Sequence, residues 1–225
     1  MAEIRIGVKQ KIPKSTDDTE NKDADASSEL EKDGSLQNSR KDGENNRRGK
    51  SSSVESLARQ NFPEECEHAI NRQINEELFA KYTYLSMAYY FQRDDVALAG
   101  CFGFFKQCSD EEQEHAEKFM KYLNDRGGRI ELGDIKKPVK NEWGSVVEAM
   151  SEALKLEKRV NRSLLDTHSV ASRCGDVQTC NFLESEYLPR QVEDIKKLAD
   201  YISSLNRVGK GLGEYIFDQE TLAGK

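Results

Sequence analysis

Apolar residues recur at spacings of three and four over four long stretches of the chain after residue 62. This spacing places them on one face of an α-helix and predicts long helices over about residues 63–92, 96–124, 145–172 and 177–207. A shorter pattern over residues 213–223 predicts a fifth helix. The predicted inward positions include Ile70, Ile74, Leu78, Leu85, Met150, Leu154, Leu164, His168, Leu198 and Leu205. No stretch sustains the alternation typical of strands, so the pattern predicts an all-α fold.

Proline and glycine mark the ends of these helices. Pro63 suits the first turn of a helix, while Gly127 and Gly175 suit the residues that follow one. The first and second helices are joined by a short link, as are the third and fourth, but about twenty residues separate the second from the third. One long connection among four helices is typical of a four-helix bundle with a single crossover. Pro189 falls inside the fourth helix, where it predicts a kink.

Polar side chains interrupt the apolar face of every long helix near its middle. In the second helix, the inward series passes through Glu112 and His115 between Cys108 and Phe119. The other helices place the following side chains inward: Glu77 and Tyr84 in the first, Glu157 in the third and Gln191 in the fourth. A buried lone carboxylate is costly unless something compensates its charge. Three acids that converge in one core therefore indicate a multivalent cation between them.

The side-chain types in this set limit the metal. Carboxylates with one imidazole suit Fe, Mn or Zn, whereas Cu(I) favours thiolate or thioether ligands. Glu112 and His115 are three residues apart, so both can lie on one helix face and bind the same ion. In the simpler alternative, each acid turns to the bundle edge or pairs with a lysine. Tyr84 is then an ordinary core residue whose hydroxyl bonds a carboxylate.

Composition divides the chain into two parts. Residues 1–61 contain no aromatic residue and no cysteine, and they carry 12 basic and 12 acidic residues. Such a segment buries too little apolar surface to fold, so we predict a disordered polar extension over residues 1–58 and a bundle over 59–225. The net charge of −7 therefore lies on the bundle, which argues against nucleic-acid binding. With five cysteines, no apolar signal segment and no long apolar run, we expect a cytoplasmic protein that does not cross a membrane.

Several stretches together resemble the ferritins of animals: INRQINEELFAKYTYLSMAYYFQRDDVAL, EEQEHAEKFMKYLNDRGGRI, DIKKP and ALKLEKRVNRSLL. The resemblance covers the chain from about Arg59 onwards. It implies a ferritin-like four-helix bundle with a short fifth helix, assembled into a shell of twenty-four subunits. It also implies iron storage and detoxification, in which Fe(II) is oxidised by dioxygen at a di-iron centre within the subunit and kept as ferric mineral.

The side chains that match the heavy-type, ferroxidase-competent subunit are Glu77, Tyr84, Glu112, His115, Glu157 and Gln191. The resemblance implies that Glu77, Glu112 and His115 hold the first iron, with Glu112 as the bridge. Glu157 and Gln191 help to hold the second iron, and the tyrosine hydrogen-bonds a ligand and supplies an electron. No histidine follows Glu157 at the third position, so we expect a weaker second site.

The resemblance assigns two further sets of acids. Glu111, Glu114 and Glu117 would face the shell cavity and nucleate mineral, although read alone they are a solvated helix face. At the pore of the shell, the family's paired Asp and Glu correspond here to Asn181 and Glu184, which removes one acid per subunit and predicts slower or less selective iron uptake.

Other functions compete with an iron-storage ferroxidase. A di-iron oxygenase or peroxidase would be expected to carry a second Glu-x-x-His and an apolar substrate pocket, and the sequence offers neither. A non-catalytic, light-type subunit would be expected to lack Glu112 or His115. The extension could instead be an interaction arm. Co-assembly with other ferritin subunits is open at this point.

Overall fold

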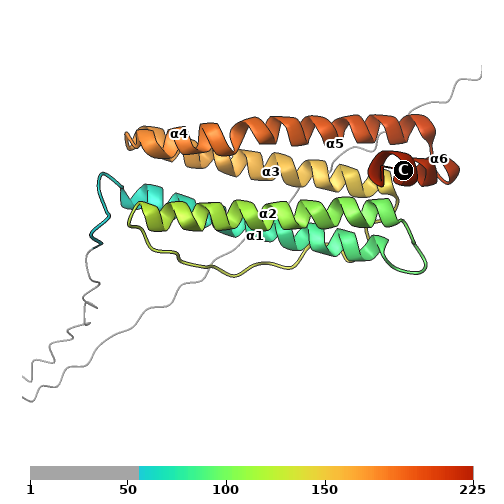
Figure 1. Ribbon diagram of the computed structural model, residues 1–225, viewed down its shortest axis with the longest axis horizontal. Helices are drawn as coiled ribbons and strands as arrows, with labels where there is room; N and C mark the ends of the chain where they lie inside the picture. Colours follow the sequence, from blue (N-terminus) through green and yellow to red (C-terminus); the bar gives the residue numbers. More distant parts are fainter. Residues whose placement is uncertain (1–55, 225) are drawn as a thin grey trace, which may run out of the picture. The chain divides into compact units, whose positions relative to one another are not determined.

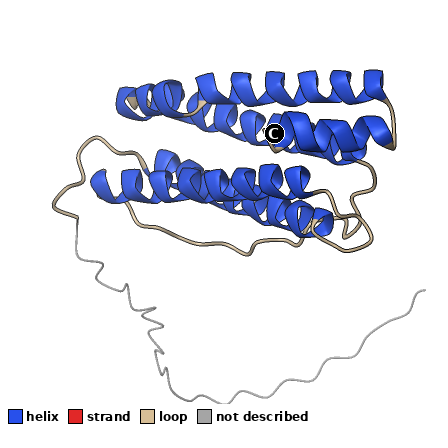
Figure 2. Cartoon of the chain, turned by 45° about the vertical axis from the view of Figure 1, so that its right-hand side comes forward, coloured by secondary structure: helices blue, strands red, loops and turns tan. Residues whose placement is uncertain are grey.

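The computed structural model describes residues 56–224 and shows a four-helix bundle (Figure 1). The helices are α1 (Glu64–Phe91), α2 (Ala99–Asp125), α3 (Val146–Arg173), α4 (Val177–Glu186), α5 (Leu188–Val208) and α6 (Leu212–Ile216), with a final π-helical turn η1 (Phe217–Leu222). Among the described residues no strand is present, so the all-α prediction is confirmed (Figure 2). Most of the predicted extension lies outside the described residues.

The helices pair as the link lengths predict. α1 and α2 lie side by side as one antiparallel pair, and α3 forms the other with α4 and α5 (Figure 1). The crossover between α2 and α3 runs along the length of the bundle, so these two helices point the same way. α2 ends where Gly127 adopts a φ of +73°, and a Cβ there would lie 2.5 Å from the backbone nitrogen of Arg59. Glycine is therefore required at this turn.

The fourth predicted helix is divided at Tyr187. α4 ends at Glu186 and α5 begins at Leu188, with Pro189 in its first turn. Proline has no N–H to donate and its ring crowds the preceding turn, so a continuous helix is broken here. The kink predicted from Pro189 is confirmed. The break turns the Tyr187 side chain into the core, where its hydroxyl donates to the backbone oxygen of His115 at 3.0 Å.

Aromatic side chains fill much of the core. Phe105 of α2 stacks on Phe91 and Tyr84 of α1, with ring centroids 5.5 Å and 6.2 Å apart. Four of the residues predicted to point inward are only half-buried: Leu78, Leu85, Leu154 and His168. The buried positions of α1 instead include Tyr84, Met87 and Ala88, so Leu85 lies at the edge of its inward face.

The C-terminal segment caps two other helices. The carboxylate of Asp218 in η1 accepts a hydrogen bond from the backbone nitrogen of Cys101 at 2.6 Å, in the first turn of α2. Glu214 of α6 accepts from the backbone nitrogen of Val146 at 2.5 Å, at the start of α3. Helix N-termini carry unpaired N–H groups and favour negative charge, so both carboxylates stabilise the helices they cap.

Within the described residues, no helix is both long enough and apolar enough to span a membrane.

Candidate metal centre

Three side chains from two helices converge in the core. α1 contributes Glu77, and α2 contributes Glu112 and His115 from adjacent turns of one face. One ligand atom from each lies within 4.8 Å of the other two, and all three side chains are buried. Among the described residues this is the one group of three or more acids, histidines or cysteines so placed. The i, i+3 spacing of the α2 pair is what brings its two side chains to the same point.

Glu77 is held by a chain of hydrogen bonds from α1 and α3. Gln73 donates through Nε2 to Glu77 Oε1 at 2.8 Å, and Ser163 Oγ donates to Gln73 Oε1 at 2.5 Å. Glu77 Oε2 is buried and has no hydrogen-bond partner. A buried acceptor without a partner is costly, and a cation at this point would satisfy it. The donor set therefore fits a bound metal.

A second set of polar side chains lies beside the first. Glu157 of α3 accepts hydrogen bonds from the Tyr84 hydroxyl and, at 3.0 Å, from Gln191 Nε2 of α5. Both Glu157 oxygens are therefore already bonded, whereas the amide oxygen of Gln191 is buried without a partner. That oxygen is free to bind a cation without breaking a bond.

Burial sets the charge of these acids. Burial raises the pKa of Glu112 to about 8, and the neighbouring Glu157 carboxylate adds to the effect. Burial and the charge of Glu112 hold the pKa of Glu77 well above its usual value. The pKa of Glu157 is raised by burial as well, although the hydrogen bonds from Tyr84 and Gln191 oppose this. Without a cation Glu112 retains its proton near neutral pH, so a dication would bind by displacing that proton.

A small cavity of about 20 Å³ opens beside these side chains. Its lining residues include Tyr84, Glu112, His115 and Glu157, together with Asp194 of α5. A volume of this size holds roughly one water molecule. It therefore suits a metal ligand or a small molecule such as dioxygen, and it is too small for an organic substrate.

Two residues at this centre were missed by the sequence analysis. Asp194 is half-buried, burial raises its pKa, and it lies three residues after Gln191. The same i, i+3 argument that found His115 from Glu112 could have found it. Gln73 precedes Glu77 by four residues, so it lies one turn away on the same face of α1.

The remaining predicted acids lie apart from the cluster. Glu111 lines the cavity and pairs with Arg190 at 2.8 Å. Glu114 and Glu117 are exposed on α2, as expected of a solvated face. Glu184 is exposed on α4 and its carboxylate lies 2.6 Å from His168 Nε2. These last three acids contribute nothing to the buried centre within one subunit.

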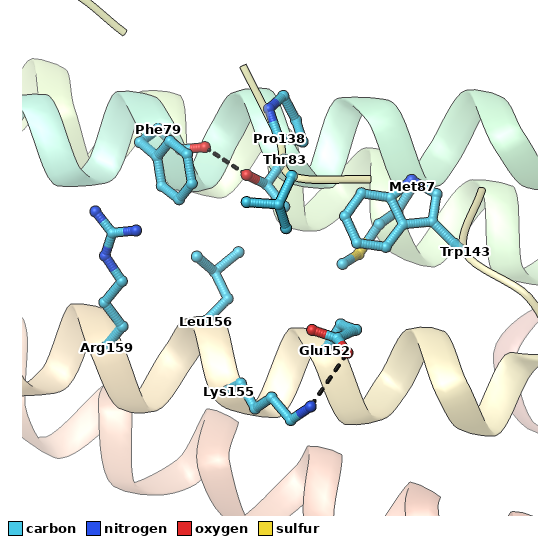
Figure 3. Close-up of a pocket in the computed structure, with 10 residues that line it drawn as sticks. Phe79, Thr83, Met87, Pro138, Trp143, Glu152, Lys155, Leu156 and Arg159 are labelled. Atoms are coloured by element: carbon cyan, nitrogen blue, oxygen red, sulfur yellow. Dashed lines mark hydrogen bonds and ion pairs between the residues drawn. The ribbon is translucent and has the colours of Figure 1, made fainter. Parts of the chain in front are cut away.

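A larger apolar cavity of about 170 Å³ lies between α1, α3 and the end of the crossover (Figure 3). Met87, Trp143 and Leu156 line it, and its polar groups already have partners. The Thr83 hydroxyl donates to the Phe79 carbonyl at 2.9 Å, and Lys155 lies 3.1 Å from Glu152. None of the clustered metal-binding side chains lines this cavity, so it is not the candidate site.

A four-helix bundle with one crossover and a buried carboxylate–imidazole cluster between its helices defines a metal-binding protein of the ferritin-like class. The family described as the ferritin-like domain matches residues 67–208. The chain belongs to the ferritin family.

Individual relatives are matched over nearly their whole length. A soma ferritin of Lymnaea stagnalis is 63% identical over 168 residues, which is 75% of this chain and 97% of the relative. A ferritin heavy chain of Echinococcus granulosus is 59% identical over 169 residues, covering 75% of this chain and 98% of the relative. A ferritin middle subunit of Aquarana catesbeiana is 55% identical over 170 residues, covering 74% and 97%. Membership of this family supports iron storage in a multi-subunit shell.

Proposed function

We propose that this chain is a ferroxidase-competent ferritin subunit. In this proposal it oxidises Fe(II) to Fe(III) with dioxygen at a di-iron centre within the subunit and stores the product as mineral in a shell of twenty-four subunits. The observation that carries the proposal is the convergence of Glu77, Glu112 and His115, with one buried Glu77 oxygen that has no partner. The similarity to a protein named ferritin heavy chain supports it.

Iron is the substrate, and the side chains divide its binding between two positions. Glu77, Glu112 and His115 would hold the first ion, and Glu112 would also reach the second because it lines the same cavity as Glu157. Gln191 and Glu157 would hold the second ion. Each ferrous ion that is oxidised gives up one electron, so a pair supplies two electrons to dioxygen within one cavity.

Asp194 completes the second position in this proposal. It lines the same cavity as Glu157, and the unpartnered amide oxygen of Gln191 lies one turn before it on α5. Tyr84 would orient Glu157 through its hydrogen bond and supply an electron to the reacting pair. An amide is a weaker ligand than an imidazole for these ions, so this position would release its product more readily.

The exposed acids would serve the assembled shell. Glu114 and Glu117 on α2 would face the interior and nucleate mineral. Glu184 would line the pore through which Fe(II) passes, where Asn181 replaces the second acid. We place the shell in the cytoplasm, either from identical subunits or from this subunit and other ferritin subunits.

The experiment that tests the centre compares the purified protein with a Glu112→Ala, His115→Ala double variant. Mixed aerobically with Fe(II), the native protein should develop ferric absorbance much faster than the variant. A matched control is Asp110→Ala, Asp125→Ala, which removes two exposed acids from the same helix outside the buried cluster. Equal rates for the native protein and the Glu112, His115 variant would show that these two side chains do not form the oxidation centre.

Size-exclusion chromatography tests assembly separately. The storage function requires a particle of hundreds of kilodaltons, whereas a single chain has a mass of 25.6 kDa. A monomer at this mass would rule out the proposed shell, and the buried centre would then be tested by the oxidation assay alone.

A further inference from the structure

Two thiols from distant parts of the chain lie next to each other at one end of the bundle. Cys66 is in the first turn of α1, and Cys174 directly follows α3. The Cys174 thiol lies close enough to raise the pKa of the Cys66 thiol through a side-chain interaction and through its charge. Cys66 is only 1% exposed, whereas Cys174 is half-buried. One thiol is therefore within reach of a small reagent, and the other lies immediately behind it.

Neighbouring bonds hold these two segments together. Arg173 of α3 pairs with Glu65 of α1 at 2.8 Å, and Cys174 Sγ lies 3.7 Å from the same Glu65 carboxylate. The residues that precede the two thiols in the chain, Glu65 and Arg173, thus form an ion pair beside them. Both sulfurs also pack on the main hydrophobic core, Cys66 within it and Cys174 against it. The contact between the thiols therefore follows from the packing of α1 on α3.

The surroundings give the two thiols different chemistry. Burial raises the pKa of Cys66 to about 12, with the charges of Cys174 and Asp176 adding to the effect. Such a thiol is a poor first nucleophile, because the thiolate is the reactive form. Cys174 is more exposed, and its S–H donates a hydrogen bond to the Glu65 carboxylate at 3.7 Å.

The pair lacks the further ligands that a metal site needs. Among residues 56–224, the clustered acids, histidines and cysteines are Glu77, Glu112 and His115 alone. Two thiols without further ligands are better suited to oxidation than to binding a cation.

We propose that Cys66 and Cys174 are a dithiol that reduces hydrogen peroxide and becomes a disulfide linking α1 to the end of α3. The Cys174 sulfur attacks one peroxide oxygen, the O–O bond breaks, and Cys174 becomes a sulfenic acid as one water leaves. The Cys66 sulfur then attacks the Cys174 sulfur, the S–O bond breaks, and the second water leaves with the Cys66 proton. Two thiols supply two electrons, and one peroxide becomes two waters.

This proposal does not depend on the di-iron chemistry. Cys66 precedes Glu77 by eleven residues, which along a helix is roughly 16 Å. The reaction can therefore be tested on full-length protein freed of iron with a chelator.

The experiment treats the reduced, chelated protein with hydrogen peroxide and then maps its peptides by mass spectrometry. The expected result is loss of two thiols per chain, a cross-linked peptide that joins Cys66 to Cys174, and recovery of both thiols with dithiothreitol. Cys180→Ser is the matched control, because Cys180 is also half-buried and lies in the same tryptic peptide as Cys174. This variant should form the same cross-link. Cys66→Ser should instead leave Cys174 as a sulfinic or sulfonic acid.

Three outcomes would overturn the proposal: a Cys174–Cys180 disulfide, a cross-link between chains, or over-oxidation of Cys174 in the native protein while Cys66 stays reduced. Thermal unfolding without reductant gives an independent measurement. The disulfide would close a loop of roughly 110 residues, so the oxidised native protein should melt at least ~5 °C above the reduced form. The Cys66→Ser and Cys174→Ser variants should show no such difference. Equal melting temperatures for oxidised and reduced native protein would count against the link.

Discussion

The two halves of the metal centre differ in how well their oxygens are satisfied without metal. In the first half, Glu77 has one oxygen bonded by Gln73 and one buried oxygen with no partner. In the second half, both Glu157 oxygens are bonded, by Tyr84 and by Gln191. A cation in the first half gives a buried carboxylate oxygen the partner it lacks, whereas in the second half the unpartnered oxygen belongs to the neutral Gln191 amide and the Glu157 carboxylate already accepts two hydrogen bonds.

This difference implies an order of binding. We expect the first position to be the tighter one, since a cation there supplies the missing partner of Glu77 Oε2. The second is weaker, because its carboxylate is shared with a tyrosine and an amide. A centre that must pass its product on to a store is served by such an imbalance, whereas a centre that retains two fixed ions would hold them more equally.

Glu112 should give the largest effect because it lies between the two halves. Glu112→Gln should slow aerobic Fe(II) oxidation by more than about 100-fold, since loss of a ligand exceeds the usual cost of losing its supporting partners. Calorimetric titration of this variant should then detect no Zn²⁺ binding at either position, whereas Glu157→Gln should still bind Zn²⁺ at one. If Glu157→Gln removes both positions, the halves are not independent and the comparison fails.

The pKa of about 8 for Glu112 predicts a strong pH dependence. Zn²⁺ must displace protons, so its affinity should rise by about tenfold per pH unit per displaced proton up to pH ~8 and then level off. Calorimetry in buffers of different ionisation enthalpy at pH 6.5 and 8.5 measures the protons released, which Glu112→Gln should reduce.

In the metal-free protein, the same buried acids should make the free energy of unfolding fall as the pH rises. Their pKa values are higher in the folded state than in the unfolded one, so the stability they contribute is complete below about pH 4.5 and is lost as the pH rises through about 8. Urea unfolding of apo protein at several pH values, native against Glu112→Gln, measures this contribution. A stabilising contribution from Glu112 that grows with pH would contradict the prediction.

Gln73 is not a proposed ligand, but it tests how the first position depends on the orientation of Glu77. Gln73→Leu removes the donor to Glu77 and leaves Ser163 without its acceptor. The affinity of the first position for Zn²⁺ should fall by about 10–100-fold, the usual cost of losing a partner that orients a ligand. Gln178→Leu, at an exposed position on α4, is the control. An unchanged affinity would show that Glu77 holds its orientation without Gln73.

Asp194 should give the smallest effect. Asp194→Ala should slow Fe(II) oxidation by about 3- to 10-fold through the second position while leaving the first Zn²⁺ affinity unchanged. The neighbouring exposed residue offers a matched control, Glu193→Ala. A change in the first affinity instead would place Asp194 outside the second half.

Sequence periodicity was sufficient for the bundle and for the first half of the centre. The steps of three and four through Glu112 and His115 continue an apolar face, so their inward direction follows from helix geometry alone. Pro189 likewise indicated the break between α4 and α5. Leu85 was predicted to point inward but is only half-buried, because spacing defines a helix face but not where the neighbouring helix contacts that face.

The hydrogen bonds of the centre could not be deduced in the same way. Whether Glu157 is satisfied depends on the rotamers of Tyr84 and Gln191, which come from two other helices. Asp194 is a different kind of miss, since its spacing from Gln191 was visible in the sequence. It was overlooked because the inward series continues from Gln191 to Leu198 through Ile195, the residue next to Asp194.

The carboxylates of Asp218 and Glu214 have a consequence for how the subunit folds. The first turn of α2 donates to Asp218, which lies 117 residues further along the chain, and the first turn of α3 donates to Glu214 in addition to its own Ser145–Glu148 capping box. A Cβ at Gly100 would lie 2.2 Å from the Asp218 carbonyl oxygen, so only glycine allows the two segments to pack this closely. Contacts between residues so far apart close a long loop, so the two helix starts gain these partners only when the C-terminal segment docks on the bundle.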